Sequence, residues 1–302
     1  MTAHASEHRL AFAPPLNPGN LFGHLAATAV PGVEETIGAT FRRTVALPGG
    51  PAILALTPRA GHVACRLLLS DPADEPAALA RARWLVDLDA DAAAIDAALA
   101  AADPALRAAV AAGPGRRVPR TVDGAELALR AVIGQQISTA AARTHAARLA
   151  AAHGAPVRDP EGGLTRLFPT PAALRGASLA MPHSRRRTFA ALVDALASGA
   201  VTLDPTASSE AHAAALDALE ALPGIGPWTR SLVAMRALGD PDAFLATDLG
   251  VRHGAAALGL PADPRPLAAR AEAWRPWRAY AVQYLWAAAT HAINAWPPPV
   301  PR

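Results

Sequence analysis

The chain has 302 residues, of which 52% are hydrophobic, and its 28 basic Lys and Arg side chains slightly outnumber the 25 acidic ones. This length allows two or three compact units with a substantial core, and the sequence contains no uninterrupted apolar run of about 18 residues that would span a membrane. The single cysteine, Cys65, excludes an internal disulfide and any four-cysteine zinc or iron–sulfur site. Met1 to Pro15 has no basic region followed by an apolar core, so we expect a soluble, cytoplasmic protein.

The first third of the chain predicts an α+β domain. Residues 1–17 are polar and contain prolines, and we expect them to form a disordered lead. The domain itself is predicted at residues 18–112, where a helical run over 21–29 precedes the strands. Short apolar and β-branched runs between Pro- and Gly-rich turns predict antiparallel strands over 41–47, 52–57 and 63–69.

Helical patterning begins at Pro72 and dominates the rest of the chain. A Gly- and Pro-rich stretch at 113–119 reads as a linker, and we expect an all-helical region over 113–296 and a proline-rich tail at 297–302. Positive charge concentrates in this region, because residues 111–302 hold 20 of the 28 arginines but 14 of the 25 acidic residues. Such an excess favours a polyanionic partner.

A short hairpin interrupts the helices at Leu222-Pro-Gly-Ile-Gly226. Its glycines are free to take positive φ, and Pro227 suits the first position of the next helix. Such a turn points backbone N–H groups outward at a helix N-terminus, where they can bind a phosphate. The hairpin therefore predicts a phosphate clamp that ignores base sequence, and an ordinary corner between two helices is the alternative.

Asp248 follows Trp228 by 20 residues, in a Gly-containing segment that opens another helix. Hairpin, helix, loop and aspartate together resemble the helix-hairpin-helix DNA glycosylases. Further motifs resemble the bacterial 3-methyladenine glycosylase II (AlkA-like) subfamily over nearly the whole chain, from about Pro18 to about Trp296. These motifs are Gly134-Gln-Gln-Ile-Ser138, Phe168-Pro-Thr-Pro171, Met181-Pro182 and Trp274-Arg-Pro-Trp-Arg-Ala-Tyr280 ahead of Trp286.

The resemblance implies a fold and a reaction. The fold would be a small antiparallel-sheet domain like the TATA-binding protein, followed by two helical lobes with the active-site cleft between them. The reaction would be hydrolysis of the N-glycosidic bond of alkylated purines extruded from duplex DNA. Asp248 would stabilise the positive charge that develops on the sugar, or orient the attacking water. An ordinary helix-capping aspartate is the alternative.

The same resemblance assigns the base pocket. Trp228 and Trp286 fall on the family's pocket tryptophans, where stacking and cation–π attraction would hold a cationic base. His24 falls on an aromatic position of the family, and Leu232 and Leu249 fall on two tyrosine positions. For His24, a titrating pocket residue and a partly exposed helix histidine are the two interpretations. These departures leave the range of accepted bases open.

Other positions would contact DNA or an ion. Gln136 lies where the family inserts a side chain into the gap left by the extruded base, and an ordinary polar residue on a helix-end turn is the alternative. The Gly224 and Gly226 N–H groups with Arg230 would contact the DNA backbone. Arg185-Arg-Arg187 is a candidate phosphate patch or an exposed arginine face. The backbone carbonyls of Glu220, Leu222 and Ile225 resemble the family's site for a structural Na⁺ or K⁺. No other cofactor is expected.

The chain contains no lysine. A Schiff-base nucleophile on an internal ε-amine is therefore not available, and the glycosylase/lyase branch carries its nucleophilic lysine where this chain has Trp228. We expect a monofunctional hydrolase that acts as a nucleoid-associated monomer without an obligate protein partner. An 8-oxoguanine-type glycosylase/lyase and an inactive helix-hairpin-helix DNA binder are the rival interpretations.

Overall fold

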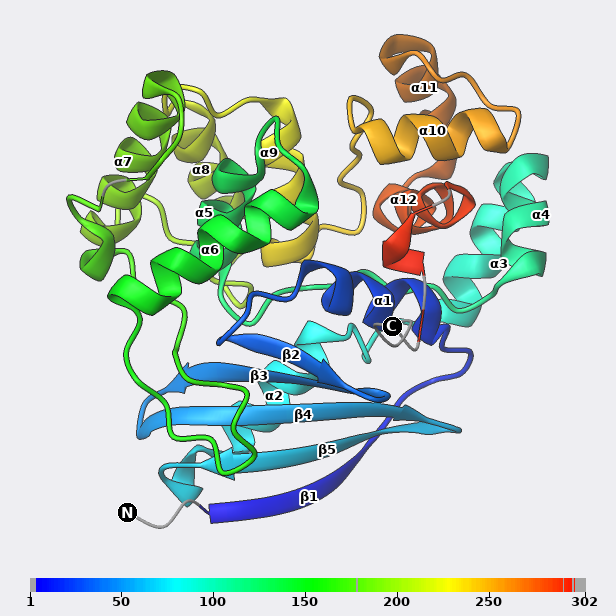
Figure 1. The fold of residues 1–302 in the computed structure, drawn as a ribbon. Helices are drawn as coiled ribbons and strands as arrows, with labels where there is room; N and C mark the ends of the chain where they lie inside the picture. Colours follow the sequence, from blue (N-terminus) through cyan, green and yellow to red (C-terminus); the bar gives the residue numbers. More distant parts are fainter. Residues whose placement is uncertain (1–3, 178, 290, 295, 297–302) are drawn as a thin grey trace.

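The computed structural model describes residues 4–177, 179–289, 291–294 and 296. Its N-terminal part is a five-stranded antiparallel sheet in the order β1-β5-β4-β3-β2 (Figure 1). The three predicted strands are confirmed as β3, β4 and β5. The strands are β1 (His4–Ala11), β2 (Glu34–Ile37), β3 (Thr40–Leu47), β4 (Gly50–Arg59) and β5 (His62–Leu69).

The first strand shows that the prediction of a disordered lead at residues 1–17 is wrong for residues 4–17, whereas residues 1–3 lie outside the described part of the chain. β1 pairs with β5 along its whole length, from His4 opposite Leu69 onward. Its polar side chains suit an edge strand with one face in solvent, and Leu10 is its one buried residue. Further along, the Asn17 side chain accepts a hydrogen bond from the Gly19 N–H and begins the first helix. The polarity that suggested disorder is the polarity of an edge strand.

One apolar core joins the sheet to two helices, α1 (Pro18–Thr28) and α2 (Glu75–Leu85). Alternate residues of the central strands, such as Leu54 and Leu67, point into this core because side chains on a strand alternate between the two faces. Phe22 of α1 is fully buried in the same cluster. This packing fixes α1 between the sheet and the helical region.

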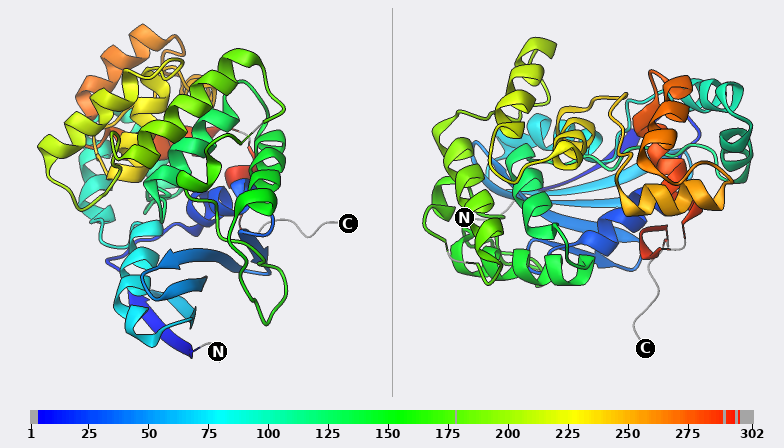
Figure 2. Two further views of the ribbon diagram at one scale, coloured as in Figure 1. Left: turned by 90° about the vertical axis from the view of Figure 1, so that its left-hand side faces the viewer. Right: turned by 90° about the horizontal axis from the view of Figure 1, so that it is seen from above.

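The helical region forms two lobes that lie side by side over the sheet (Figures 1 and 2). Within the described residues, no helix is long and apolar enough to cross a membrane. The first lobe contains α5 (Gly124–Gly134), α6 (Thr139–His153), η2 (Ala172–Leu174), α7 (His183–Ser198), α8 (Ser209–Glu220), α9 (Pro227–Val233) and the π-helical turn η3 (Ala234–Leu238). The second contains α3 (Ala92–Ala102), α4 (Pro104–Ala112), α10 (Leu249–Ala257), α11 (Pro264–Ala271), η4 (Glu272–Trp274) and α12 (Arg278–Ala288). Two short 3-10 turns, η1 (Pro72–Asp74) and η5 (Ala292–Asn294), complete the described elements.

The helices α3 and α4 pack in the second lobe, although they precede the predicted domain boundary at residue 112. They pack against η4 and α12, and the buried Asp103 accepts hydrogen bonds from Trp274 Nε1 (3.0 Å) and Arg270 Nε (2.7 Å). The stretch at 113–119, predicted as a linker, is largely buried, since Arg117 is fully buried and donates to the carbonyls of Asp87 and Ala90. Partners so distant in sequence leave no local signal for this packing.

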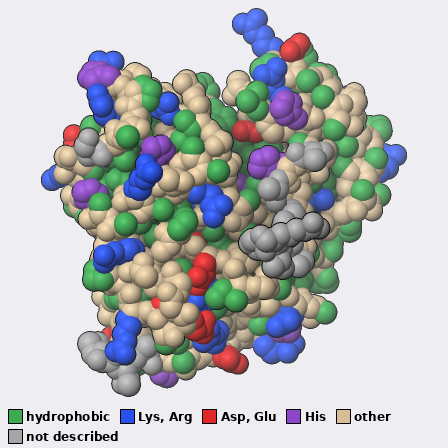
Figure 3. Space-filling view, viewed as in Figure 1, with side chains coloured by type: hydrophobic (Ala, Val, Ile, Leu, Met, Phe, Trp, Pro, Cys, Tyr) green, Lys and Arg blue, Asp and Glu red, His purple; other side chains and the backbone are tan. Residues whose placement is uncertain are grey.

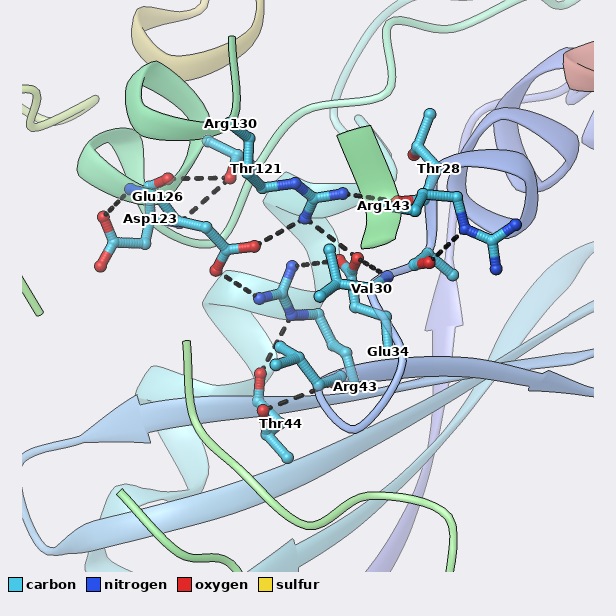
Figure 4. Close-up of polar contacts among 12 residues, drawn as sticks. Thr28, Val30, Glu34, Arg43, Thr44, Thr121, Asp123, Glu126, Arg130 and Arg143 are labelled. Carbon is cyan, nitrogen blue, oxygen red and sulfur yellow. Dashed lines mark hydrogen bonds and ion pairs between the residues drawn. The ribbon is translucent and has the colours of Figure 1, made fainter. Parts of the chain in front are cut away.

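A buried ionic network ties the sheet to the first lobe (Figure 4). Arg43 of β3 donates to Glu34 (2.8 Å) and to Glu126 (2.7 Å). Arg130 of α5 donates to the same two carboxylates, at 2.9 Å and 2.7 Å, and to the Thr28 carbonyl. Burial alone would raise the pKa of Glu126, but the two neighbouring guanidinium groups outweigh it and lower that pKa. Each buried charge is thus matched by opposite charges on two elements.

We predict that Glu126→Gln lowers the free energy of unfolding by about 3 kcal/mol, because it leaves two buried guanidinium groups undercompensated. Since folding lowers the pKa of Glu126, its contribution is complete above about pH 5 and is lost as the pH falls through the folded value. Urea titrations between pH 7 and pH 3 measure both effects. Asp89→Asn is the control, because the Asp89–Arg83 pair is exposed and its loss costs less than about 1 kcal/mol. Equal losses in the two variants would contradict the role of the network.

Candidate functional site

Asp248 is the N-cap of α10. It has an extended backbone conformation, and its Oδ1 accepts a hydrogen bond from Val251 N (2.9 Å). The carboxylate therefore lies at the positive end of a helix. Asp248 is therefore a helix cap, as the alternative interpretation expects. Capping does not explain the other hydrogen bonds that this carboxylate accepts.

Two indole N–H groups also donate to this carboxylate. Trp228 Nε1 of α9 donates to Oδ2 (3.0 Å), and Trp286 Nε1 of α12 donates to Oδ1 (2.9 Å). The half-buried carboxylate thus receives bonds from three elements, one of them in the opposite lobe. Figure 3 shows an indentation between the two lobes at the top of the molecule. These two indole N–H groups and the backbone N–H of Val251 fix the orientation of the negatively charged Asp248 carboxylate.

Two glycines of α10 allow Trp286 to come this close, and sequence analysis did not single them out. A Cβ on Gly250 would lie 3.1 Å from both Asp248 Oδ1 and Trp286 Cδ1. A Cβ on Gly254 would collide with the Leu285 carbonyl of α12. Glycines four residues apart on one helix face are the signal that could have indicated this close helix packing.

His24 completes the cluster from α1. Its ring stacks on Trp286, with 5.7 Å between centroids and 27° between planes, and the residue is 8% exposed. Burial, then the positive charges of Arg236, Arg130 and His291, lowers the pKa of His24 well below its usual value. The imidazole is therefore neutral at neutral pH. The predicted pocket residues Asp248, Trp228, Trp286 and His24 are thus together in the fold.

The two leucines at the family's tyrosine positions differ in exposure. Leu232 of α9 is buried at 7% exposure, whereas Leu249 directly after Asp248 is 64% exposed. Neither supplies an aromatic face. The stacking surface near Asp248 consists of the two tryptophans and His24.

The predicted hairpin joins α8 to α9, and its two glycines have different roles. Gly224 has φ +80°, and a Cβ there would collide with Thr188 of α7. Gly226 has φ −118°, and no atom lies within 4 Å of where its Cβ would be, so positive φ is not required there. Neither N–H donates to another described residue, which leaves both available to a ligand.

Gln136 stands beside the hairpin in a strained conformation. It is exposed and has φ +58°, which is uncommon for a residue with a side chain. The adjacent Gln135 fixes this turn. Its Nε2 lies 3.3 Å from both the Gly224 carbonyl and Thr229 Oγ1, and its carbonyl accepts from Arg185 (2.7 Å). Arg185, one of the three candidate patch arginines, therefore supports the presentation of Gln136.

Arg230, predicted to contact the DNA backbone, is paired with carboxylates of the protein itself. Its guanidinium pairs with Asp217 (3.1 Å) and Glu220 (2.9 Å) of α8. The nearby carbonyls of Glu220 and Ile225 accept no hydrogen bond from the described residues, while Leu222 O accepts from Ile225 N (3.2 Å). The carbonyls of Glu220 and Ile225 therefore have no acceptor role within the described residues, and the predicted Na⁺ or K⁺ site stays a prediction. No group of three or more His, Cys, Asp or Glu side chains in the described ranges could hold a metal ion.

The chain is similar to proteins named as AlkA or as 3-methyladenine DNA glycosylases. A family model described as the AlkA N-terminal domain matches residues 7–123. A Mycobacterium tuberculosis protein named "Probable bifunctional transcriptional activator/DNA repair enzyme AlkA" is 53% identical over 92% of this chain, but the chain spans only 56% of that protein. DNA-3-methyladenine glycosylase 2 of Escherichia coli is 31% identical, with 92% of this chain and 96% of that protein covered. A 3-methyladenine DNA glycosylase structure from Archaeoglobus fulgidus shares the fold, with a TM-score of 0.74 at 20% identity over 93% of this chain and 97% of that one.

We predict that Gly224→Ala lowers the free energy of unfolding by about 2 kcal/mol or more, because a side chain at positive φ is strained and this one also meets Thr188. Gly226→Ala is the matched control and should change it by less than about 1 kcal/mol, since its φ and surroundings accept a side chain. Denaturant titration of both variants measures the difference. Similar values for the two would show that the turn does not depend on Gly224.

Proposed function

The chain belongs to the AlkA family of DNA-3-methyladenine glycosylases, and on this basis we propose that it removes alkylated purines of the 3-methyladenine type from duplex DNA. The observation that carries the proposal is the Asp248 carboxylate, held by two indole N–H groups and a backbone N–H. A module that only binds DNA has no use for such an arrangement. The E. coli relative, named as a glycosylase, is matched over nearly its whole length.

The reaction is hydrolysis of the bond between C1′ of the sugar and the base nitrogen. As that bond breaks, its electron pair passes to the base and positive charge develops at C1′ and the ring oxygen. Asp248 stabilises this charge electrostatically, because its orientation is set before the substrate arrives. Water then adds to C1′ and loses a proton, for which Asp248 is the nearby acceptor. The products are the free base and an abasic site.

The absence of lysine supports hydrolysis without strand cleavage. The glycosylase/lyase mechanism needs an amine nucleophile, and this chain has no ε-amine. Trp228, at the position where the lyase branch carries lysine, instead donates its N–H to Asp248. The 8-oxoguanine glycosylase/lyase alternative is therefore disfavoured, and we expect DNA strands that break at the abasic site only after alkali or heat.

DNA contacts follow from the surface beside this site. We assign the free N–H groups of Gly224 and Gly226 to a phosphate, which positions the duplex without reading bases. Gln136, held in its strained turn, is assigned to the gap left by the extruded base. Arg230 is assigned an indirect role in DNA binding, because its guanidinium is already paired with two carboxylates of α8. A Na⁺ or K⁺ on the free hairpin carbonyls would brace the turn and takes no part in the chemistry.

We predict that Asp248→Asn lowers single-turnover release of 3-methyladenine from methylated duplex DNA by roughly 10²-fold or more. The amide keeps an oxygen for Val251 N but loses the charge, and its NH₂ group would face an indole donor. Asp263→Asn is the control, because Asp263 is an exposed helix-start aspartate away from the cluster. Activity of Asp248→Asn within a few-fold of the wild type would overturn the assignment.

A further inference from the structure

The strand β1 leaves one edge of the sheet open. It is the first strand in the order β1-β5-β4-β3-β2, and it pairs with β5 residue against residue. In such a strand every second residue points its backbone N–H and C=O away from the neighbouring strand. Apart from the Ala11 carbonyl, which accepts a hydrogen bond from Arg83, no backbone group of β1 has a partner outside β5 among the described residues. Figures 1 and 2 show no described element beyond this edge.

The side chains of β1 carry two opposite charges on the exposed face of the sheet. Proteins often protect an open edge with prolines or bulges, because the edge otherwise pairs with another chain, but β1 has neither. It has instead Glu7 and Arg9, both exposed and two residues apart. In the described ranges the polar contacts of β1 side chains involve Ser6 and His8, so neither charge has a partner within the chain. These two charges are therefore available to another strand.

A second copy of β1 fits this edge. When two copies pair antiparallel about a two-fold axis through His8, Glu7 of each copy stands directly opposite Arg9 of the other, on the same face of the sheet. Directly opposed side chains have Cβ atoms about 5 Å apart, so both pairs can form ion pairs. An axis through Glu7 or through Arg9 would instead place two like charges opposite each other. The charges therefore select one register.

We propose that two copies of this chain form a dimer by antiparallel pairing of their β1 strands, centred on His8, which joins the two five-stranded sheets into one continuous sheet. A contact that consists mainly of one strand pair is small, so the dimer is weak and reversible. The helices α9, α10 and α12, which hold the Asp248 cluster, lie at the opposite end of the molecule from β1 (Figure 1). The two sites of the dimer thus face away from each other. The dimer does not depend on the proposed glycosylase activity.

Charge reversal tests the register by sedimentation velocity over a dilution series that starts at about 1 mM. Glu7→Arg and Arg9→Glu each create two pairs of like charges in the interface, and each should raise the dissociation constant of the wild-type dimer roughly tenfold or more. The double variant Glu7→Arg/Arg9→Glu should restore association, and so should an equimolar mixture of the two single variants, because both arrangements again oppose unlike charges. Arg59→Glu, exposed on β4 away from the edge, is the control and should leave dimerisation unchanged.

Hydrogen exchange tests the strand pairing itself. The amides of β1 should exchange more slowly well above the dissociation constant than far below it, while those of β2, the other edge strand, should not change. Because Glu7 and Arg9 are exposed, each variant should keep the wild-type thermal midpoint.

Three results would overturn the proposal. The wild type could stay the monomer expected from the sequence over the whole series, the dimer could survive both single reversals, or neither the double variant nor the mixture could restore association. Equal exchange of the β1 amides at both concentrations would overturn it as well. Single-turnover release of 3-methyladenine per chain should be the same in the dimeric and monomeric forms, so the dimer and the proposed function are tested separately.

Discussion

The hydrogen bonds to the Asp248 carboxylate connect parts of the molecule that are otherwise far apart. Trp228 comes from the first lobe, while Trp286 and the cap of α10 come from the second. A carboxylate that accepts three N–H bonds cannot turn without breaking one, so its position depends on both lobes at once. The close contact of α10 and α12 at Gly250 and Gly254 is what brings the second indole within reach.

The sheet domain contributes to the site through α1. The buried network of Arg43, Glu34, Glu126 and Arg130 fixes the sheet against α5. Because Arg130 also binds the carbonyl of Thr28, the same network holds the end of α1. His24 lies one turn earlier on that helix and reaches Trp286. The sheet and the helical lobes therefore form the site together, although the sheet supplies no residue that contacts Asp248.

Turns and helix caps are easier to predict from the sequence than the boundaries of domains. The hairpin, the capping aspartate and the tryptophans could be predicted because each depends on local turn chemistry or matches a motif. The edge strand β1 could not be predicted, because only one of its residues is buried and its sequence is therefore as polar as that of a disordered segment. The placement of α3 and α4 was missed because alanine-rich helices carry no information about which neighbour they pack on, and the deciding bonds join Asp103 to Trp274 and Arg270. The pairing of Arg230 and the different conformations of Gly224 and Gly226 likewise depend on three-dimensional contacts.

A preoriented Asp248 carboxylate should stabilise positive charge on the sugar. Duplexes that carry at one abasic position either a cationic pyrrolidine or a neutral tetrahydrofuran ring test it directly by equilibrium binding. We expect the wild type to prefer the cationic ring by about tenfold or more, Asp248→Asn to abolish this preference, and Trp286→Phe to reduce it. Trp274→Phe, which removes an indole N–H bonded to Asp103 instead, should keep the preference. An equal preference in the wild type and Asp248→Asn would show that the Asp248 charge does not stabilise a cationic sugar.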